Sequence, residues 1–389
     1  MNGFDWQPRT RLVFGAGCAD RVGELARELG AQRVLLVTDR GIVGAGHAAK
    51  VERALTASGV GVTLFDQVCE NPTTGDVDRC VAVARQGAIE LIVGLGGGSS
   101  MDTAKGCNLL LTNGGQMRDY WGVGKATRPM LPLIAIPTTA GTGSECQSAA
   151  LIADETTHQK MACLDPKAAA RVALLDPALT LSQPARVTAV TGIDAIAHAV
   201  ETAVTSKRTQ ISLIYSREAF KLLAPAFSEV MARPAALEAR ADMLLGAAFG
   251  GLAIEYSMLG AAHSAANPLT AHHGIVHGHA VGLLLPWVVR FNGQDPETAR
   301  AYANLAVTAG LASLDDVPAT AVETLAQRLE WFLKIASLPA SLAACNVARS
   351  AIPALAAEAA RQWTAGFNPR PITAADFERL YTEAFEPRG

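Results

Sequence analysis

The sequence lacks long hydrophobic runs, paired-cysteine motifs and an excess of charge of either sign. Only 18% of its 389 residues are charged, and the formal net charge is −3. No polybasic patch is present to attract nucleic acid or an anionic membrane surface. The longest apolar stretch, near residues 282–289, is too short to span a bilayer. Half of the residues are nevertheless hydrophobic, which predicts a well-buried globular enzyme rather than a disordered chain.

Cysteine is scarce and irregularly placed. The seven cysteines are odd in number, and none forms a C-x-x-C motif. Reduced thiols in the cytoplasm are the simplest interpretation. Residues 1–9 lack a charged segment followed by an apolar one, which is the pattern of a secretory signal. The sequence therefore predicts a cytoplasmic protein.

Length and patterning predict two domains. In the first half, short apolar strands alternate with helices, which predicts a mostly parallel, Rossmann-like sheet covered on both faces. The expected strands are residues 11–14, 33–38, 60–65, 90–94, 131–136, 159–164 and 171–175, and the expected helices are residues 43–58, 77–86 and 99–111. Later, Ala- and Leu-rich helical patterns interrupted by prolines replace the strand patterns. We expect an α/β domain at residues 1–183 and an all-helical domain at residues 184–389.

Asp194 and His198 lie four residues apart in an Ala-rich run. Side chains at i and i+4 project from the same face of a helix, so this pair can hold one cation. An ordinary hydrogen bond between the two side chains is the alternative. A second stretch favours a metal, because five of the eight histidines fall within the seventeen residues from His263 to His279. Imidazole is the commonest metal ligand, so the two stretches together predict a metal site.

A glycine-rich turn follows one of the expected strands. Gly96, Gly97 and Gly98 lead into a helix, and without Cβ atoms they let a phosphate approach the backbone at the positive end of that helix. Ser99 stands where the dinucleotide fingerprint has its third glycine, and the loop follows a later strand than the first. A diphosphate is the expected ligand, and a purely structural turn is the alternative.

Two further polar features lie where strands are expected to end. Residues 137–145 carry several hydroxyl groups and a carboxylate, and ligands of doubly wound sheets bind at that edge. An ordinary turn capped by Ser144 explains only part of this density. Asp39 can accept both hydroxyls of an adenosine ribose and would repel a 2′-phosphate, which favours NAD over NADP. An Asp after a strand is also a common turn residue.

These motifs resemble those of the iron-dependent (group III) alcohol dehydrogenase family along nearly the full length of the chain. The resemblance rests on residues 96–105, 137–145 and 192–201, and on His263 followed by His277-Gly278. It implies an N-terminal nucleotide-binding α/β domain and a C-terminal helical domain, in a dehydroquinate synthase-like architecture. It also implies a catalytic divalent metal in the cleft between them.

The resemblance assigns roles to individual residues. The metal ligands, and through the metal the catalytic residues, would be Asp194, His198, His263 and His277. The residues in contact with NAD(H) would be Asp39, Asn71, Gly96, Gly97, Gly98, Ser99, Asp102, Thr138, Thr139, Thr142, Ser144, Lys160 and Leu179. The metal would be Fe²⁺, with Zn²⁺ as the alternative because imidazole suits both ions.

One position departs from the family pattern. Many members carry a further His four residues after His263, where it is thought to serve proton transfer. Here Asn267 stands in that place, and Thr270 replaces a glycine. Asn can hydrogen-bond but cannot titrate. A proton relay would then run through water, the cofactor ribose, or His272 or His273.

We interpret the chain as an NAD(H)- and metal-dependent alcohol dehydrogenase or aldehyde reductase. Three imidazoles and one carboxylate leave coordination positions open for an alcohol oxygen. The alternatives on the same scaffold are a polyol dehydrogenase, a hydroxyacid-oxoacid transhydrogenase and a dehydroquinate synthase. The last needs a basic pocket, and only scattered arginines lie near these motifs. A helical scaffold that binds metal for stability alone is the non-catalytic alternative.

A small to medium primary alcohol, or its aldehyde, is the expected substrate. Residues 146–150, 249–256 and 363–367 would line its pocket, and most of them are apolar. The family is usually oligomeric, so we expect a homodimer or a larger homo-oligomer. The apolar N-terminal strand and residues 283–289 could form its interface, although a buried core helix explains the latter equally well.

Overall fold

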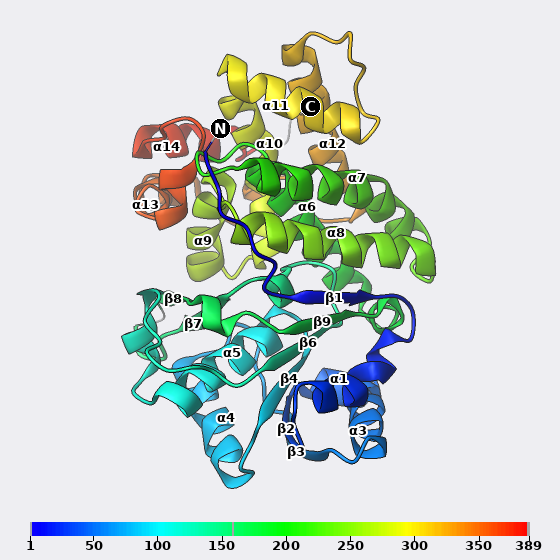
Figure 1. Ribbon diagram of the computed structural model, residues 1–389. Coiled ribbons are helices and arrows are strands. Elements are labelled where there is room, and N and C mark those ends of the chain that lie inside the picture. Colours follow the sequence, from blue (N-terminus) through cyan, green and yellow to red (C-terminus); the bar gives the residue numbers. More distant parts are fainter. Residues whose placement is uncertain (1, 158, 387–389) are drawn as a thin grey trace. The chain divides into compact units, whose positions relative to one another are not determined.

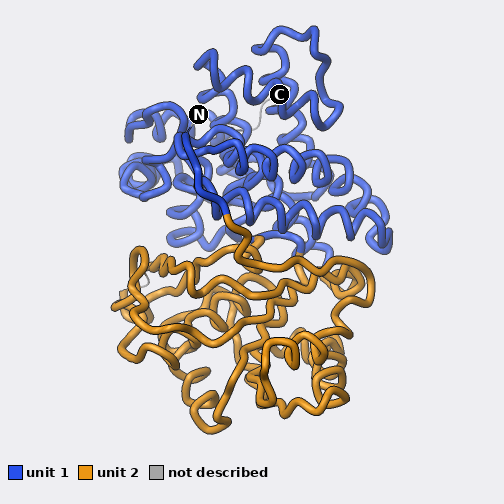
Figure 2. The backbone as a smooth tube through the Cα atoms, viewed as in Figure 1, with its two compact units in different colours: residues 1–6, 140–142, 184–389 blue, residues 7–139, 143–183 orange. Residues whose placement is uncertain are grey.

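The computed structural model describes residues 2–157 and 159–386 of the chain. They form two compact units, which Figure 2 shows in different colours. The α/β unit comprises Gln7–Thr139 and Gly143–Gln183. The helical unit comprises Met1–Trp6, Ala140–Thr142 and Pro184–Gly389.

The α/β unit is built on a six-stranded parallel sheet, which confirms the expected fold class (Figure 1). In sheet order, its strands are β1 (Arg11–Phe14), β9 (Val172–Leu175), β6 (Leu133–Pro137), β4 (Leu91–Gly96), β2 (Arg33–Val37) and β3 (Gly61–Phe65). Every neighbouring pair is parallel. Strands β4 and β6 are buried along their whole length, because a parallel sheet is covered on both faces.

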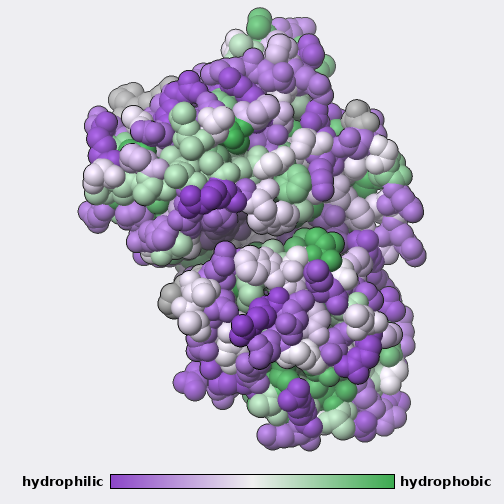
Figure 3. All heavy atoms as spheres, turned by 90° about the vertical axis from the view of Figure 1, so that its left-hand side faces the viewer, coloured by the Kyte–Doolittle hydropathy of each residue, from purple (hydrophilic) through white to green (hydrophobic). Residues whose placement is uncertain are grey.

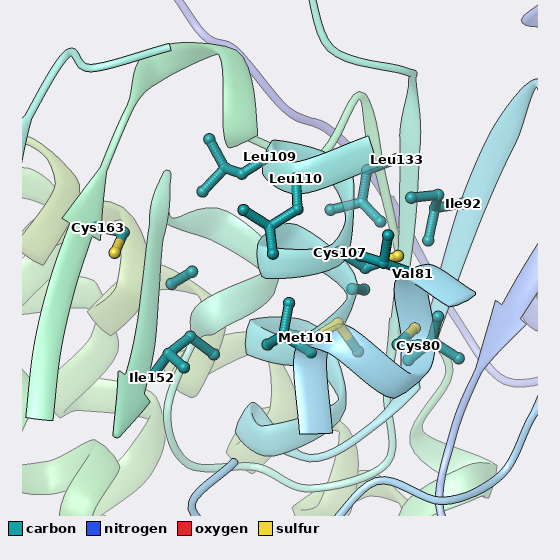
Figure 4. Close-up of a cluster of buried hydrophobic side chains, with 14 of the residues drawn as sticks. Cys80, Val81, Ile92, Met101, Cys107, Leu109, Leu110, Leu133, Ile152 and Cys163 are labelled. Atoms are coloured by element: carbon teal, nitrogen blue, oxygen red, sulfur yellow. The ribbon is translucent and has the colours of Figure 1, made fainter. Parts of the chain in front are cut away.

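Helices cover both faces of this sheet. The helices of the unit are α1 (Val22–Glu28), α2 (Arg40–Gly44), α3 (His47–Ala57), α4 (Thr74–Gln86) and α5 (Gly98–Asn113). Alternate residues of a strand point to opposite faces. Leu35 therefore packs with residues of α4 and α5, whereas Leu36 packs with residues of α1 and α3. Figure 4 shows part of the first cluster, including Cys80 of α4 and Met101 of α5.

Several elements differ from the sequence expectation. The helix expected at residues 43–58 is divided into α2 and α3, because Gly46 adopts a φ of 82° between them. Helix α1 was not anticipated. A small second sheet is formed by β5 (Gly122–Val123), β8 (Lys160–Leu164) and β7 (Ala149–Ala153). The sequence predicted β8 but neither β5 nor β7.

The helical unit has no β-strand in its described part, as expected. Its helices are α6 (Ala185–Thr202), α7 (Gln210–Ala232), α8 (Leu237–Glu255), α9 (Ala261–His273), α10 (His277–Asn292), α11 (Pro296–Thr308), α12 (Pro318–Ile335), α13 (Ile352–Ala359) and α14 (Ala374–Glu383). Residues 283–289, considered above as an interface, are buried within α10 and form core.

Two short segments from the first half of the chain also belong to the helical unit. The centroid of the Trp6 ring lies 6.5 Å from that of the Tyr256 ring, so the N-terminal segment packs against the end of α8. The 140–142 segment rests on α6, where a Cβ at Gly141 would lie 2.6 Å from Cβ of Thr191. Only a glycine permits so close an approach.

Figure 3 shows one face on which hydrophilic residues predominate and hydrophobic residues gather in small groups. Within residues 2–157 and 159–386, no helix has the length and apolar character that a membrane crossing requires.

Candidate functional site

Helix α6 carries Asp194 and His198 on a buried face. The helix starts after Pro184, and every residue from Gly192 to Thr202 is buried. Small alanines allow neighbouring helices to pack close to it. The four-residue spacing places Nε2 of His198 3.5 Å from Oδ1 of Asp194.

His263 and His277 approach the same oxygen from two other helices. Helix α9, which carries His263, ends at Gly274 with a φ of 63°, and α10 begins at His277. Nε2 of His263 lies 3.5 Å, and Nε2 of His277 3.8 Å, from Oδ1 of Asp194. The ligand atoms of Asp194, His263 and His277 all lie within 4.8 Å of one another. The structure thus brings together the four side chains that the sequence pointed to as metal ligands.

Two of the atoms at the centre of this group lack hydrogen-bond partners. Oδ1 of Asp194 and Nε2 of His263 are buried and unpartnered. Buried polar atoms in native proteins are nearly always satisfied. A divalent cation held by these residues would satisfy both atoms. The donor set therefore fits a metal ion, and it suits both Fe²⁺ and Zn²⁺.

The electrostatic environment of the four candidate ligands favours binding of a positive charge. Burial raises the pKa of Asp194, but His198, His263 and His277 outweigh this effect and hold the pKa well below its usual range. Burial lowers the pKa of His263, but the carboxylates of Glu201 and Asp194 outweigh it and raise the pKa to about 9. For His198 burial prevails, and the pKa is lowered. A divalent cation meets the same electrostatic preference and competes with the proton on His263.

Glu201 contacts the ligand group, and the sequence analysis assigned it no role. It is buried on α6, and its Oε2 lies 2.5 Å from Nδ1 of His263. Its Oε1 accepts a hydrogen bond from the backbone N–H of Ala262 at 2.7 Å. A carboxylate on Nδ1 fixes the ring and leaves Nε2 free as a ligand. The spacing from Asp194 through His198 to Glu201 continues one helical face, which is the signal that could have found it.

Gly278 allows α10 to approach α6. A Cβ at this position would lie 2.0 Å from the carbonyl oxygen of Val190 and 3.1 Å from Cβ of Asp194. Any other residue would push the start of α10 away. The pairing of His277 with a following glycine therefore has a steric reason.

Asn267 and His272 have partners outside the ligand group. Nδ2 of Asn267 donates to Oε1 of Gln362 at 3.1 Å. His272 is nine residues after His263, which places it half a turn round α9, and its exposed ring pairs with Glu358 at 2.6 Å. His272 is therefore poorly placed to replace the missing family histidine.

The loops expected to bind a dinucleotide lie next to one another in the α/β unit. Strand β4 lies between β2 and β6, so the segments that follow them share the carboxyl edge of the parallel sheet. A Cβ at Gly96 would lie 3.5 Å from Oδ2 of Asp39, and one at Gly97 would lie 3.4 Å from Oγ1 of Thr139. Thr138 is bound to the same loop, since its N–H donates to the carbonyl of Gly96 at 3.0 Å.

The glycine turn leaves room for a phosphate at the start of α5. Gly97 is the N-cap and contributes no side-chain cap, so the first N–H groups of the helix, from Gly98 and Ser99, face outward. Gly96 has a φ of 142°, and a Cβ there would collide with Oγ of Ser100 at 2.4 Å. Oγ of Ser100 and Oγ1 of Thr38 are buried without hydrogen-bond partners. These features fit a bound diphosphate and sugar.

Asp39 serves both as a turn residue and as a neighbour of the glycine loop. Its Oδ1 accepts from the N–H of Ile42 at 3.0 Å and so caps α2. Its other oxygen, Oδ2, lies next to Gly96 of the glycine loop. The capping role does not use the second oxygen.

Four more of the expected cofactor residues form two pairs. The N–H of Asn71 donates to Oγ of Ser99 at 3.2 Å. Oγ of Ser144 donates to Oδ1 of Asp102 at 3.1 Å, and burial raises the pKa of Asp102. The buried Lys105 supports the second pair, because its Nζ donates to the backbone oxygen of Ser144 at 2.6 Å.

The remaining expected cofactor residues are placed differently. Thr142 belongs to the helical unit. Lys160 is exposed at the start of β8 and affects the pKa of Asp102 through its charge. The side chain of Leu179 is buried in the core beside α1 and α3, so only its main chain could reach a ligand.

The segment at residues 137–145 also contains a buried carboxyl group, that of Glu145, to which the sequence analysis assigned no separate role. Glu145 is 2% exposed, and its Oε1 has no hydrogen-bond partner. Burial raises its pKa to about 7, although its own backbone N–H and the charge of Lys105 act in the opposite direction.

A parallel sheet with a glycine loop at its carboxyl edge, and a helical unit with imidazoles around one carboxylate, are features expected of a metal-dependent oxidoreductase. The chain belongs to the iron-containing alcohol dehydrogenase family. The family model described as iron-containing alcohol dehydrogenase matches residues 8–177, and the model of the family's C-terminal domain matches residues 188–385. The resemblance seen in the sequence is confirmed, and the protein acts on CH–OH groups as an alcohol dehydrogenase or aldehyde reductase.

Relatives match nearly the whole chain. The NAD-dependent methanol dehydrogenase of Bacillus methanolicus is 32% identical over 372 residues, which cover 96% of this chain and 97% of that protein. The lactaldehyde reductase of Escherichia coli K12 is 31% identical, with 96% and 97% covered. The crystal structure of a 1,3-propanediol oxidoreductase superposes with a TM-score of 0.95 at 29% identity, covering 99% of this chain and 100% of that one.

Proposed function

We propose that this alcohol dehydrogenase or aldehyde reductase depends on a divalent metal and on NAD(H). The observation that carries the proposal is the buried, unpartnered Oδ1 of Asp194 with three imidazole nitrogens 3.5–3.8 Å away. We assign Asp194, His198, His263 and His277 as the metal ligands. The family description favours Fe²⁺, and the ligand types allow Zn²⁺ as well.

The residues around the site would position the reactants. A bound metal would polarise the alcohol or carbonyl oxygen, and a nicotinamide would exchange the hydride. Glu201 holds the His263 ring with Nε2 directed at the ligand group. Asn267 cannot take up a proton. We therefore propose that the alcohol proton leaves through water or the cofactor ribose.

NAD(H) is proposed as the cofactor rather than NADP(H). The free oxygen of Asp39 beside Gly96 would repel a 2′-phosphate, and the Bacillus methanolicus relative is NAD-dependent. The proposed contacts are Asp39, Asn71, Gly96, Gly97, Gly98, Ser99, Asp102, Thr138, Thr139, Thr142, Ser144 and Lys160, with the main chain of Leu179.

The proposed substrate is a small to medium primary alcohol or its aldehyde. The relatives named above act on methanol, lactaldehyde and 1,3-propanediol, all of which are short. Within the helical unit, the segments at residues 249–256 and 363–367 are the proposed pocket lining. Substrates with a carboxylate should react with lower kcat/KM than alcohols of equal length.

We also propose a homo-oligomer in the cytoplasm. Strand β1 is at the edge of the six-stranded sheet, and its Phe14 is 44% exposed, so this edge could pair with a second copy. All seven cysteines are free thiols, which suits a reducing compartment.

The His263→Ala variant tests the proposed function. We expect it to lose bound metal and NADH formation from a primary alcohol together, while NADH still binds to the α/β unit. Measurements of metal content, turnover and NADH fluorescence titration on one sample distinguish these effects. Retained turnover in a variant without metal would reject the proposal.

A further inference from the structure

The first turn of α9, which carries His263, depends on side chains from elsewhere in the helical unit. Its N-cap is Gly260, which has no side chain to accept the first N–H groups of the helix. Oδ1 of Asn368 accepts from the first N–H group at 3.4 Å, and Oε1 of Glu201 accepts from the second at 2.7 Å. Both N–H groups are buried, so they would otherwise be unsatisfied.

Asn368 is itself held by a buried pair of carboxamides. Its Nδ2 donates to Oδ1 of Asn292 at 2.7 Å, and its Oδ1 accepts from Nδ2 of Asn292 at 3.0 Å. The two side chains are 6% and 1% exposed. Asn292 is the last residue of α10, the helix that begins with His277. One carboxamide therefore links the start of α9 to the end of α10.

Two residues near Asn368 make further hydrogen bonds within the helical unit. The carbonyl oxygen of Phe367 accepts from the N–H of Ser206, just beyond the end of α6, at 2.9 Å. Nη1 of Arg370 donates to the carbonyl oxygen of Phe291 at 2.8 Å, near the end of α10. This short segment thus contacts α9 and α10 directly, and it contacts the turn that follows α6.

We propose that Asn368 is a positioning residue for the metal site, which fixes the start of α9 against the end of α10 and so keeps His263 at ligand distance from Asp194. The inference rests on the proposed metal-dependent function. The packing at the helix start is tight, because a Cβ at Gly260 would lie 3.2 Å from Oδ1 of Asn368 and 3.1 Å from Oε1 of Glu201. A small displacement of either acceptor therefore moves the turn that carries His263.

Titration of the metal-free protein with Co²⁺ tests this role, because the visible absorption of Co²⁺ reports both affinity and ligand geometry. We expect Asn368→Ala to weaken Co²⁺ binding by about tenfold or more and to shift the absorption bands. The matched control is Thr373→Ala, which removes the side-chain cap of α14 and leaves every hydrogen bond at the start of α9 in place. We expect it to lower Tm and to leave the Co²⁺ affinity and spectrum unchanged.

A second variant keeps the test decisive if Asn368→Ala does not fold. Gly260→Ala retains both acceptors but places a methyl group against them, so it should also weaken Co²⁺ binding and alter the spectrum. Wild-type affinity and spectrum in the folded variants would overturn the inference and leave the proposed function intact. An equal loss of affinity in Thr373→Ala would also overturn it, because it would show general loosening. If the wild-type protein itself binds no Co²⁺, the proposed metal-dependent function fails, and the inference fails with it.

Discussion

The buried carboxyl group of Glu145 should lower the free energy of unfolding of the protein as the pH rises from 5 to 8. Its pKa is raised from 4.5 to about 7 in the folded chain, chiefly by burial. The folded state therefore holds this proton more tightly than the unfolded state. The resulting stabilisation is fully present below about pH 4.5 and is lost as the pH rises through about 7. At about 1.36 kcal/mol per unit of pKa, the full effect is about 3 kcal/mol, of which about 2.5 kcal/mol falls between pH 5 and pH 8.

Urea denaturation of the wild type and of Glu145→Gln, both without cofactor, measures this effect. Gln keeps the shape of the side chain and does not titrate, so other groups cancel in the difference between the two proteins. We expect the wild type to lose about 2.5 kcal/mol of unfolding free energy relative to the variant between pH 5 and pH 8. A difference that stays constant with pH, or that grows in favour of the wild type, would refute the reasoning.

The site gives three further predictions. Glu201→Ala removes the acceptor of Nδ1 of His263 and should weaken metal binding about 10- to 100-fold in competition with a chromophoric chelator, and unchanged affinity would exclude this role. Gly278→Ala places a Cβ 2.0 Å from the carbonyl oxygen of Val190, so the start of α10 must move. We expect Tm to fall by an amount equivalent to about 1–3 kcal/mol and bound metal to decrease. A wild-type Tm and metal content would contradict the packing argument. Asp39→Asn keeps a cap for α2 but removes the negative charge. The ratio of kcat/KM for NADP to kcat/KM for NAD should then rise about tenfold, which corresponds to about 1.4 kcal/mol. An unchanged ratio would leave Asp39 as a turn residue only.

Much of the α/β unit could be predicted because buried parallel strands have continuous apolar sequences. The strands expected at residues 33–38 and 131–136 appear as β2 and β6. Strand β7 was missed because its sequence, AALIA, has no clear alternation and only weak β-propensity at its alanines. Helix α1 spans only Val22–Glu28, and so short a helix is stabilised by packing that a local pattern does not reveal.

The same distinction applies to the site. Asp194 and His198 could be paired from the sequence because one helix fixes their spacing. The helical spacing places Glu201 on the same face as Asp194 and His198, but it does not reveal its role, because its partner His263 is 62 residues away and the contact exists only once α6 and α9 pack together. The cap that Asn368 provides for α9 spans a still longer separation of 107 residues. Long-range hydrogen bonds of this kind leave no periodic signal in the chain.

The central claim, that a metal ion held by Asp194 and the three histidines is required for hydride transfer, is tested most directly by removing and restoring the metal. The protein is treated with a chelator, its metal content is measured by mass spectrometry, and NADH formation from a primary alcohol is followed as Fe²⁺ or Zn²⁺ is added back. We expect activity to vanish with the metal and to return in proportion to the ion bound, reaching its maximum at a single ion per chain. Full activity in protein shown to contain no metal would contradict the claim.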